Sequence, residues 1–143
     1  MIKAKPATNL QPAYFEWDEK FKVLIGDVPQ ALRQKLIKSN EEITFNKKHQ
    51  KTTETDWLKF GKGFLREAVK GWVGMTYRYL LDICRPIILD PGIKLDDLIE
   101  FDEENFSFLL DNYRMDFANF VTHGVTSLDD IYAEQAKKEL ENL

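Results

Sequence analysis

Three side chains in the sequence are of the types that most often carry catalysis or bind metal: His49, Cys84 and His123. Cys84 falls on an apolar stripe just before Arg85, where a free cysteine is more often a small core residue than a nucleophile. His123 precedes Gly124 at an expected helix end, where an imidazolium favours the negative pole of the helix dipole. The sequence contains no familiar catalytic or metal-binding motif. We therefore expect no catalytic residue, no metal site and no cofactor, and a small enzyme or metal protein that uses these three residues is the alternative.

Charged segments give two further candidates. The acidic residues at 96–104 and 129–130 could gather a divalent cation, but they lack the alternating oxygen ligands and the glycine of a calcium loop. Helix N-termini explain most of them. Because the net charge is −4, nucleic acid has no general electrostatic attraction to the chain, and we expect no such partner. The best candidate for it is a compact basic run that we interpret as a solvated surface, comprising Lys47, Lys48, His49 and Lys51.

The composition is that of a small globular protein. With 143 residues, 43% of them apolar, the chain is long enough for a single domain with a substantial core. Cys84 is the only cysteine, so no intrachain disulfide can form, which fits a reducing cytoplasm. No stretch approaches the roughly 20 apolar residues of a membrane span, and the N-terminus lacks the apolar run of a secretion signal. We expect a cytoplasmic protein with no membrane partner.

The clearest predicted element is a central helix from Asp56 to Gly74. Its apolar residues recur at helical spacing and comprise Trp57, Phe60, Phe64, Leu65, Ala68, Val69 and Trp72. Asp56 is expected to cap the first turn. The helix is predicted to end at the segment G-W-V-G, where Trp72 stands between Gly71 and Gly74 as a large core residue.

The N-terminal third alternates between strand and helix patterns. Residues 1–12 are polar, contain two prolines and predict a flexible arm. Residues 13–28 alternate in hydrophobicity and predict either a hairpin that turns at Asp18-Glu19 or one bent strand. Residues 27–39 predict a short helix. Residues 41–47 predict a second strand that could pair with the first, and the polar segment after it predicts a loop.

The segment after the central helix mixes apolar and turn-forming residues. A helix is predicted at about 76–83 and stops before Pro86. The apolar residues 87–89 predict a third strand or a buried extended segment, and residues 90–92 predict a turn. The spacing of apolar residues at 95–99 suggests one further turn of helix.

The C-terminal part is predicted to be helical. One long helix begins at Asp102 and stops at Gly124, and a last helix begins at Ser127 and frays into a charged tail. The predicted fold class is α+β and mainly α, with two to three short strands packed against four to five helices in one domain at residues 13–143. Three tryptophans, five tyrosines and ten phenylalanines exceed what such a core requires, so some are expected at a partner interface.

Four segments together characterise the chain: FKVLIGDVPQALRQKL, ITFNKKHQKTTETDW, FLREAVKGWVGMT and EFDEENFSFLLDNY. Their order resembles that of the tail assembly chaperones of long-tailed bacteriophages and related prophages. The likeness spans roughly residues 21–120, and the segments G-W-x-G and F-D-E-E-N-F are its most telling pair. Residues 76–99 depart from the family pattern, which has a short polar connection at this place.

The resemblance implies a non-catalytic protein that binds the apolar, helical tape-measure protein and keeps it soluble while tail-tube subunits polymerise around it. Such a chaperone acts in the cytoplasm of the bacterial host and is absent from the mature virion. Its further candidate partners are the tail-tube protein and other copies of itself. A minor tail or tail-completion protein that stays in the virion is the alternative. The residues that mark the family or bind the partner are Trp57, Phe60, Phe64, Gly71, Trp72, Gly74, Phe101 and Phe106.

Overall fold

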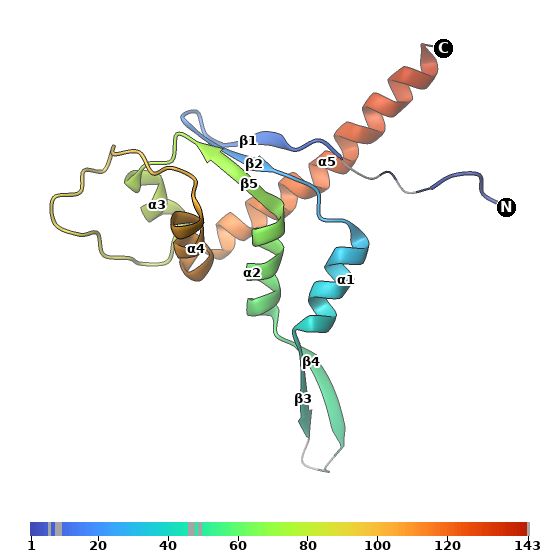
Figure 1. Cartoon of the computed structure of the whole chain (residues 1–143), viewed down its shortest axis with the longest axis horizontal. Helices are drawn as coiled ribbons and strands as arrows, with labels where there is room; N and C mark the ends of the chain where they lie inside the picture. Colours follow the sequence, from blue (N-terminus) through green and yellow to red (C-terminus); the bar gives the residue numbers. More distant parts are fainter. Residues whose placement is uncertain (6, 8–9, 46–47, 49, 143) are drawn as a thin grey trace.

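The structure is a computed structural model that describes residues 1–5, 7, 10–45, 48 and 50–142, with the backbone alone at 42–45 and 52. In this part of the chain five strands and five helices follow one another in the order β1, β2, α1, β3, β4, α2, β5, α3, α4, α5 (Figure 1). The fold class is α+β and mainly α, as predicted. The described residues between 1 and 12 form neither helix nor strand.

Three strands form an antiparallel sheet in the order β1-β2-β5, with bounds Ala13–Asp18, Phe21–Ile25 and Val69–Val73. The alternating segment at 13–28 is therefore a hairpin that turns between Asp18 and Phe21, and the alternative of one bent strand is wrong. Phe21, Val23 and Ile25 are completely buried, whereas the residues between them are half-buried. One face of the sheet thus forms part of the core, as the two-residue period of a strand requires.

The central helix, α2 (Trp57–Ala68), begins where predicted, but it ends six residues early. The Asp56 carboxylate accepts hydrogen bonds from the backbone N–H groups of Leu58 and Lys59, each at 3.1 Å, which confirms the cap. After Ala68 the chain continues as β5, in which Trp72 pairs with Val23. The predicted helix is wrong here because valine, tryptophan and glycine are weak helix formers, and the open edge of β2 provides partners for their backbone groups.

A second hairpin lies between α1 (Gln30–Ser39) and α2, and it consists of β3 (Glu41–Phe45) and β4 (Lys51–Thr55). The predicted helix at 27–39 is confirmed, with Pro29 at its N-cap. The predicted strand at 41–47 exists, but it pairs with β4 instead of the first strand, and β4 lies in a segment that was predicted to be a loop. Residues Lys47 and His49 lie outside the described part of the chain.

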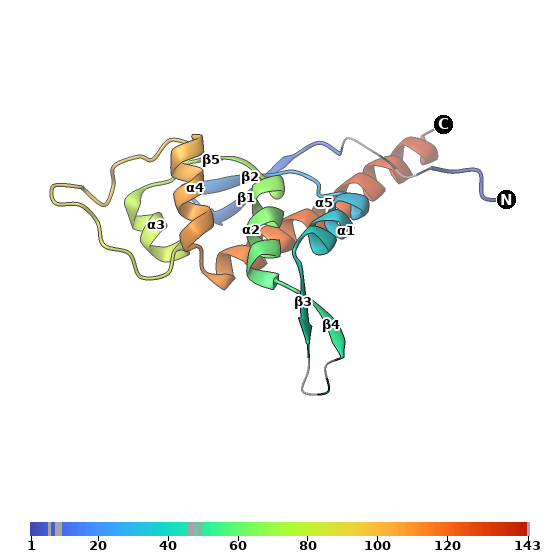
Figure 2. The same ribbon diagram turned by 60° about the horizontal axis from the view of Figure 1, so that its bottom comes forward.

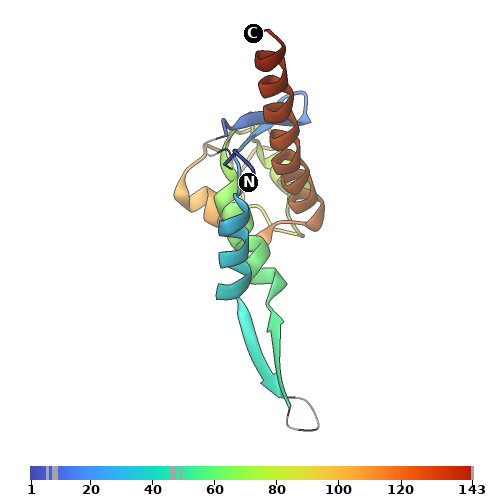
Figure 3. The same ribbon diagram turned by 90° about the vertical axis from the view of Figure 1, so that its right-hand side faces the viewer.

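The base of the second hairpin explains this pairing. The backbone N–H of Asp56 donates to the carbonyl oxygen of Asn40 at 2.8 Å, so the end of α1 and the start of α2 are joined directly. The two strands consequently leave the helices as a pair and project away from the body (Figure 3). Threonine is β-branched and suits a strand, but its polarity made residues 51–55 resemble a loop.

Three helices complete the chain: α3 (Tyr77–Ile83), α4 (Glu103–Asn112) and α5 (Met115–Glu141). The helix predicted at 76–83 is confirmed. The single helix predicted from Asp102 to Gly124 is wrong, because Tyr113 and Arg114 adopt extended backbone angles between α4 and α5. At this point Arg114 N–H donates to the Ile83 carbonyl at 2.8 Å, and Arg85 N–H donates to the Asn112 carbonyl at 2.8 Å. The end of α3 therefore pairs with the junction and separates the two helices.

Helix α5 is longer than predicted, since it passes through Gly124 and the expected start at Ser127 and contains the charged tail. Gly124 does not stop the helix, because Ile25 and Phe15 pack against this point of α5 from the sheet. The side chains that bury α5 against β1, β2 and α2 recur at helical spacing and comprise Phe117, Val121, Val125 and Leu128. The last turns of α5 are exposed and extend beyond the sheet (Figure 1).

The segment between α3 and α4, which we call the 86–101 loop, contains neither helix nor strand. Residues 87–89 are therefore not a third strand, and they are not a buried segment either, since Ile88 is 98% exposed. The helical turn expected at 95–99 is also wrong, because Leu98 pairs with Thr76 in a β-bridge. The turn at 90–92 is confirmed, and Gly92 there has a φ of 88°.

Two glycines with positive φ provide a test of this architecture. Gly74 ends β5 with a φ of 74°, and a Cβ at this position would collide with the carbonyl oxygen of Lys20, whereas a Cβ on Gly92 meets no atom within 4 Å. We expect Gly92→Ala to lower the free energy of unfolding by about 1 kcal/mol through backbone strain alone. Gly74→Ala should cost at least about 2 kcal/mol, because the collision adds to the same strain. Urea unfolding of both variants measures the difference, and equal losses would contradict the close approach of β5 to the β1–β2 turn.

Candidate functional site

The candidate residues from the sequence lie in two separate clusters. Gly71, Trp72, Gly74, Phe101 and Phe106 gather where β5 meets the 86–101 loop and α4, and Trp57, Phe60 and Phe64 lie along α2. The two clusters differ in exposure. The first contains the two segments that best carry the family resemblance, and the second contains the aromatic residues of the central helix.

The first cluster packs the G-W-x-G segment against the F-D-E-E-N-F segment. Trp72 is only 8% exposed, as the sequence predicted, and its ring centroid lies 4.7 Å from that of Phe101 in an edge-to-face contact. Phe106 is 5% exposed, and its ring centroid lies 6.3 Å from that of Trp72. The indole N–H of Trp72 donates to the carbonyl oxygen of Ile99 at 2.8 Å. This cluster therefore attaches the 86–101 loop to the sheet, which is a structural role.

The second cluster is a row of three rings that passes from the surface into the core. Trp57 is 64% exposed, Phe60 is half-buried and Phe64 is 8% exposed. Successive ring centroids lie 5.4 Å and 6.1 Å apart. Trp57 begins the apolar stripe of α2 but lies in solvent, because the first turn of α2 extends past the elements that cover its later turns. An aromatic ring of this size that stays in solvent is a natural anchor for a partner.

An apolar cleft of about 390 Å³ opens beside this row, between α2 and the first half of α5. We call it the apolar cleft; it is lined by Arg33, Trp57, Leu58, Phe60, Gly61, Phe64, Leu65, Tyr113, Met115, Ala118, Asn119, Thr122 and Thr126. Leu58 is 78% exposed and Met115 is 64% exposed at its mouth. Methionine adapts its shape to a bound surface, and large exposed apolar side chains at a cleft are typical of grooves that take an apolar helix.

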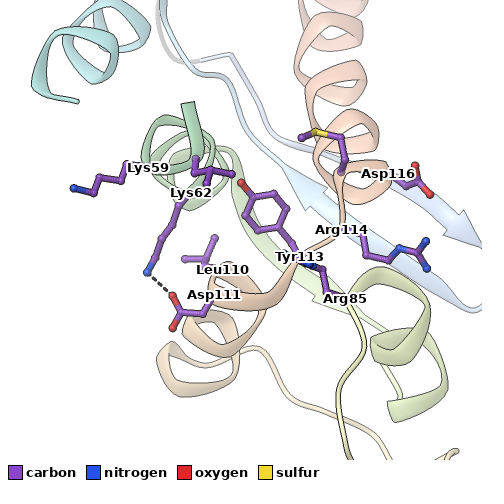
Figure 4. Close-up of a pocket in the computed structure, with 10 residues that line it drawn as sticks. Lys59, Lys62, Arg85, Leu110, Asp111, Tyr113, Arg114 and Asp116 are labelled. Atoms are coloured by element: carbon purple, nitrogen blue, oxygen red, sulfur yellow. Dashed lines mark hydrogen bonds and ion pairs between the residues drawn. The ribbon is translucent and has the colours of Figure 1, made fainter. Parts of the chain in front are cut away.

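A second cleft of about 630 Å³ shares Leu58, Tyr113 and Met115 with the first and therefore adjoins it. Figure 4 shows the side chains that line this second cleft. We call it the basic cleft, because its rim holds more basic than acidic side chains, namely Lys59, Lys62, Arg85 and Arg114 against Asp111 and Asp116. Lys62 forms an ion pair with Asp111 across this cleft. Lys59 also forms an ion pair, with Asp56 at 4.0 Å, so the excess of positive charge beside the exposed apolar surface comes from Arg85 and Arg114 against Asp116. This surface suits a partner that carries both apolar and acidic groups.

Tyr113 stands between the two clefts. Its hydroxyl reaches α2 at Gly61, where a Cβ would lie 2.7 Å from the hydroxyl oxygen, so glycine at this position makes the approach possible. Burial raises the pKa of the Tyr113 hydroxyl above its ordinary value of 10.0. A glycine in the interior of α2 thus has a packing reason.

Of the residues that line these clefts, the sequence singled out only Trp57, Phe60 and Phe64 as candidates for partner binding, and those it missed include Leu58, Tyr113, Arg114 and Met115. The last three were assigned to the interior of one long helix, where their spacing gave no reason to place them at a cleft. Only the interruption after Asn112 brings them to the surface beside α2. The apolar stripe continues at helical spacing from Tyr113 to Phe117 and Phe120, so no local signal marked the interruption.

The residues first considered for catalysis do not come together as a site. Cys84 is 1% exposed at the end of α3, as a core residue should be, and burial raises the pKa of its thiol to about 11 despite the neighbouring Arg85. His123 is exposed in the interior of α5, so the prediction that it caps a helix end is wrong. His49 lies outside the described residues. The described residues contain no cluster of three or more His, Cys, Asp or Glu side chains that could hold a metal ion.

Comparison of the chain with protein-family models found no match, and comparisons with curated proteins and with solved structures found none either. Of the helices in the described ranges, none has both the length and the apolar composition needed to span a bilayer.

The buried Cys84 thiol makes stability depend on alkaline pH. Its pKa is raised from 9.0 to about 11 in the folded state, so the stability it contributes is fully present below pH 9 and is lost as the pH rises towards 11. We expect the wild-type chain to lose about 2 kcal/mol more than Cys84→Ala between pH 8 and pH 11. Urea unfolding of both proteins across this range measures the loss. Parallel pH profiles would show that the thiol is not buried in this way.

The indole hydrogen bonds of two tryptophans allow a matched comparison. Trp72→Phe leaves the carbonyl oxygen of Ile99 without its donor, and we expect a loss of about 1 to 3 kcal/mol. The indole of Trp17 donates to Asp82, whose carboxylate is exposed and can bind water instead. Trp17→Phe should therefore cost less in the same unfolding experiment. A larger loss at Trp17 would contradict the anchoring role of Trp72.

Proposed function

We propose that this protein is a tail assembly chaperone of a long-tailed phage or prophage, and that its apolar cleft holds an apolar helix of the tape-measure protein. The protein acts without catalysis, in the cytoplasm of the bacterial host, and leaves before the virion is complete. The observation that carries the proposal is the row of rings from Trp57 to Phe64, which begins in solvent and continues into the core along one wall of the cleft.

The chemistry of the cleft supports a helical, apolar partner. Its two long walls are helices, α2 and α5, and its lining is mainly aromatic and aliphatic, as in grooves that take an apolar helix. A tape-measure protein is long, helical and apolar, and before the tail tube encloses it the protein needs its apolar faces covered. An exposed tryptophan beside an adaptable methionine can cover such faces without requiring one particular sequence in the bound helix.

The buried cluster around Trp72 supports the same proposal in another way. The segments G-W-x-G and F-D-E-E-N-F, which carry the resemblance most strongly, lie in contact through Trp72, Phe101 and Phe106. Residues that pack together in this way mark a shared fold, whereas partner binding is assigned to the exposed residues of α2. The family resemblance and the apolar cleft thus concern different residues, and each supports the proposal independently.

Co-expression tests the proposal directly. When the chain is produced with the tape-measure protein encoded just downstream of it, we expect the soluble fraction of that protein to rise several-fold and the two to co-purify. Trp57→Ala should reduce the co-purified amount about 10-fold, because it removes the exposed anchor and leaves the core intact. The matched control is Tyr14→Ala, which removes another exposed ring, 53% accessible, from strand β1. No gain in solubility and no co-purification with the wild-type chain would refute the proposal.

Mass spectrometry of purified phage particles separates the chaperone from its main alternative. A chaperone is expected to be missing from mature particles and present in lysates that contain unassembled tails. A signal in stoichiometric ratio to other tail proteins would instead indicate a minor tail or tail-completion protein.

A further inference from the structure

We propose that Arg33 makes the apolar cleft selective for an apolar helix that carries a carboxylate. The guanidinium of Arg33 lies at one end of the cleft and Trp57 lies at the other. The bound helix therefore presents an aspartate or a glutamate about two turns away from the apolar residue that packs on Trp57. This inference rests on the proposed function, since it concerns the same cleft, and it names the feature by which the cleft selects one apolar helix over another.

Arg33 is the one charged side chain among the described residues that line the apolar cleft. The α5 wall adds no charge, because the hydroxyl groups of Thr122 and Thr126 donate to carbonyl oxygens of α5 itself, at 2.9 Å and 3.1 Å. Charged side chains are rarely kept in apolar surroundings without a partner of opposite charge. A single guanidinium in such a cleft therefore indicates a ligand with one matching negative charge.

The guanidinium of Arg33 is held in place, but only part of it is used. The residue is half-buried, and its Nε donates to the carbonyl oxygen of Val28 at 2.8 Å. Its Cζ lies 5.8 Å from the centroid of the Phe64 ring, in a cation–π contact. The two terminal nitrogens make no hydrogen bond or ion pair to the described residues. Because the side chain is already fixed, these nitrogens can bind a carboxylate with little further loss of conformational freedom.

Two carboxylates of the chain lie near Arg33 without pairing with it. Asp27 and Asp129 share a neighbouring cavity of about 340 Å³ with Arg33, but neither forms an ion pair with it. Asp129 follows Thr126 by three residues on α5, so this cavity adjoins the end of the apolar cleft that is farther from Met115. The guanidinium thus lies between the two cavities. A carboxylate bound in the apolar cleft attracts it more strongly than these two, because less water screens the charges there.

The length of the cleft sets the spacing of the two contacts. Its lining residues on α5 extend from Met115 to Thr126, a length of about 16 Å or about three helical turns. Arg33 reaches the cleft from α1, which packs against α2 (Figure 2). Its guanidinium lies over Phe64, seven residues after Trp57. Seven residues of a helix span about 10 Å, so a helix that lies along α2 meets both groups with residues about seven positions apart.

Matched synthetic peptides test the preference for a carboxylate. Each is a helical peptide of about 18 residues built from leucine, alanine and glutamine, with one leucine on either side of its centre at the same spacing of seven residues. Either direction of the bound helix then reaches Trp57. One peptide has glutamate at the centre and the other has glutamine. Fluorescence anisotropy of the labelled peptides with the full-length protein should give a dissociation constant about 10-fold lower for the glutamate peptide. The net charge of −4 opposes this difference, so long-range attraction does not produce it.

Two arginine variants assign the preference to one side chain. Arg33→Gln should bind both peptides equally, whereas a general structural effect of the substitution would weaken both alike and leave their ratio unchanged. Arg66→Gln is the matched control. Its guanidinium lies 5.9 Å from the ring of Phe106 in a similar contact, but it pairs with Glu103 and does not line the cleft. Arg66→Gln should keep the wild-type preference, and thermal unfolding of both variants verifies that they are folded.

Charge reversal completes the test. Arg33→Glu should bind a third peptide, with lysine at its centre, more tightly than the glutamate peptide. Equal binding of the glutamate and glutamine peptides to the wild-type chain, or a preference that persists in Arg33→Gln, would overturn the inference. Binding of neither peptide would overturn it as well, even if decanoate, a small carboxylate with an apolar chain, binds in the cleft.

Failure of this inference is distinguishable from failure of the proposed function. Co-purification of the tape-measure protein without any difference between the peptides would refute the role of Arg33 alone. A clear preference for the glutamate peptide without co-purification would refute the proposed function, and the cleft would then be a site for a different acidic, apolar helix.

Discussion

The pairing of β5 with β2 is the interaction on which most of this structure depends. It ends α2 at Ala68, places Trp72 opposite Val23 and closes the three-stranded sheet. From this position the indole of Trp72 reaches the carbonyl oxygen of Ile99 and fixes the end of the 86–101 loop. A segment of five residues therefore joins the sheet, the central helix and the loop, because its backbone pairs in one direction and its largest side chain packs in another.

A second constraint of the same kind creates the clefts. The end of α3 pairs with Tyr113 through a β-bridge, and this pairing interrupts what would otherwise be one helix from α4 through α5. The interruption turns Tyr113 towards Gly61 on α2 and exposes Met115 at the mouth of the apolar cleft. Both clefts share these residues, so the position of one bridge determines the shape of the whole binding region. Backbone hydrogen bonds between distant segments thus act here as the main determinants of surface shape.

The aromatic residues of the chain divide into two groups by burial, and the division matters for function. Trp72 and Phe106 are almost fully buried and hold the fold together. Trp57, by contrast, remains in solvent and begins a row of rings that continues into the core through Phe60 and Phe64. The residues that carry the resemblance in the sequence are therefore distinct from the residues suited to hold a partner. The charged surfaces add a further distinction, since the apolar side chains of the loop stand among carboxylates and those of the adjoining cleft among lysine and arginine.

The sequence by itself determined the elements whose signals are local. The cap at Asp56, the strand pattern at 13–28, the helices at 27–39 and 76–83, the turn at 90–92 and the burial of Trp72 and Cys84 all follow from residue type and period. Of the candidate site, the aromatic row of α2 was visible in the same way. Tertiary structure alone decided that Val69–Val73 is a strand, that Lys51–Thr55 pairs with β3, and that α4 and α5 are separate. In each case the deciding hydrogen bonds join residues far apart in the chain or override local polarity. A short window of the sequence therefore does not show which backbone pairing is preferred.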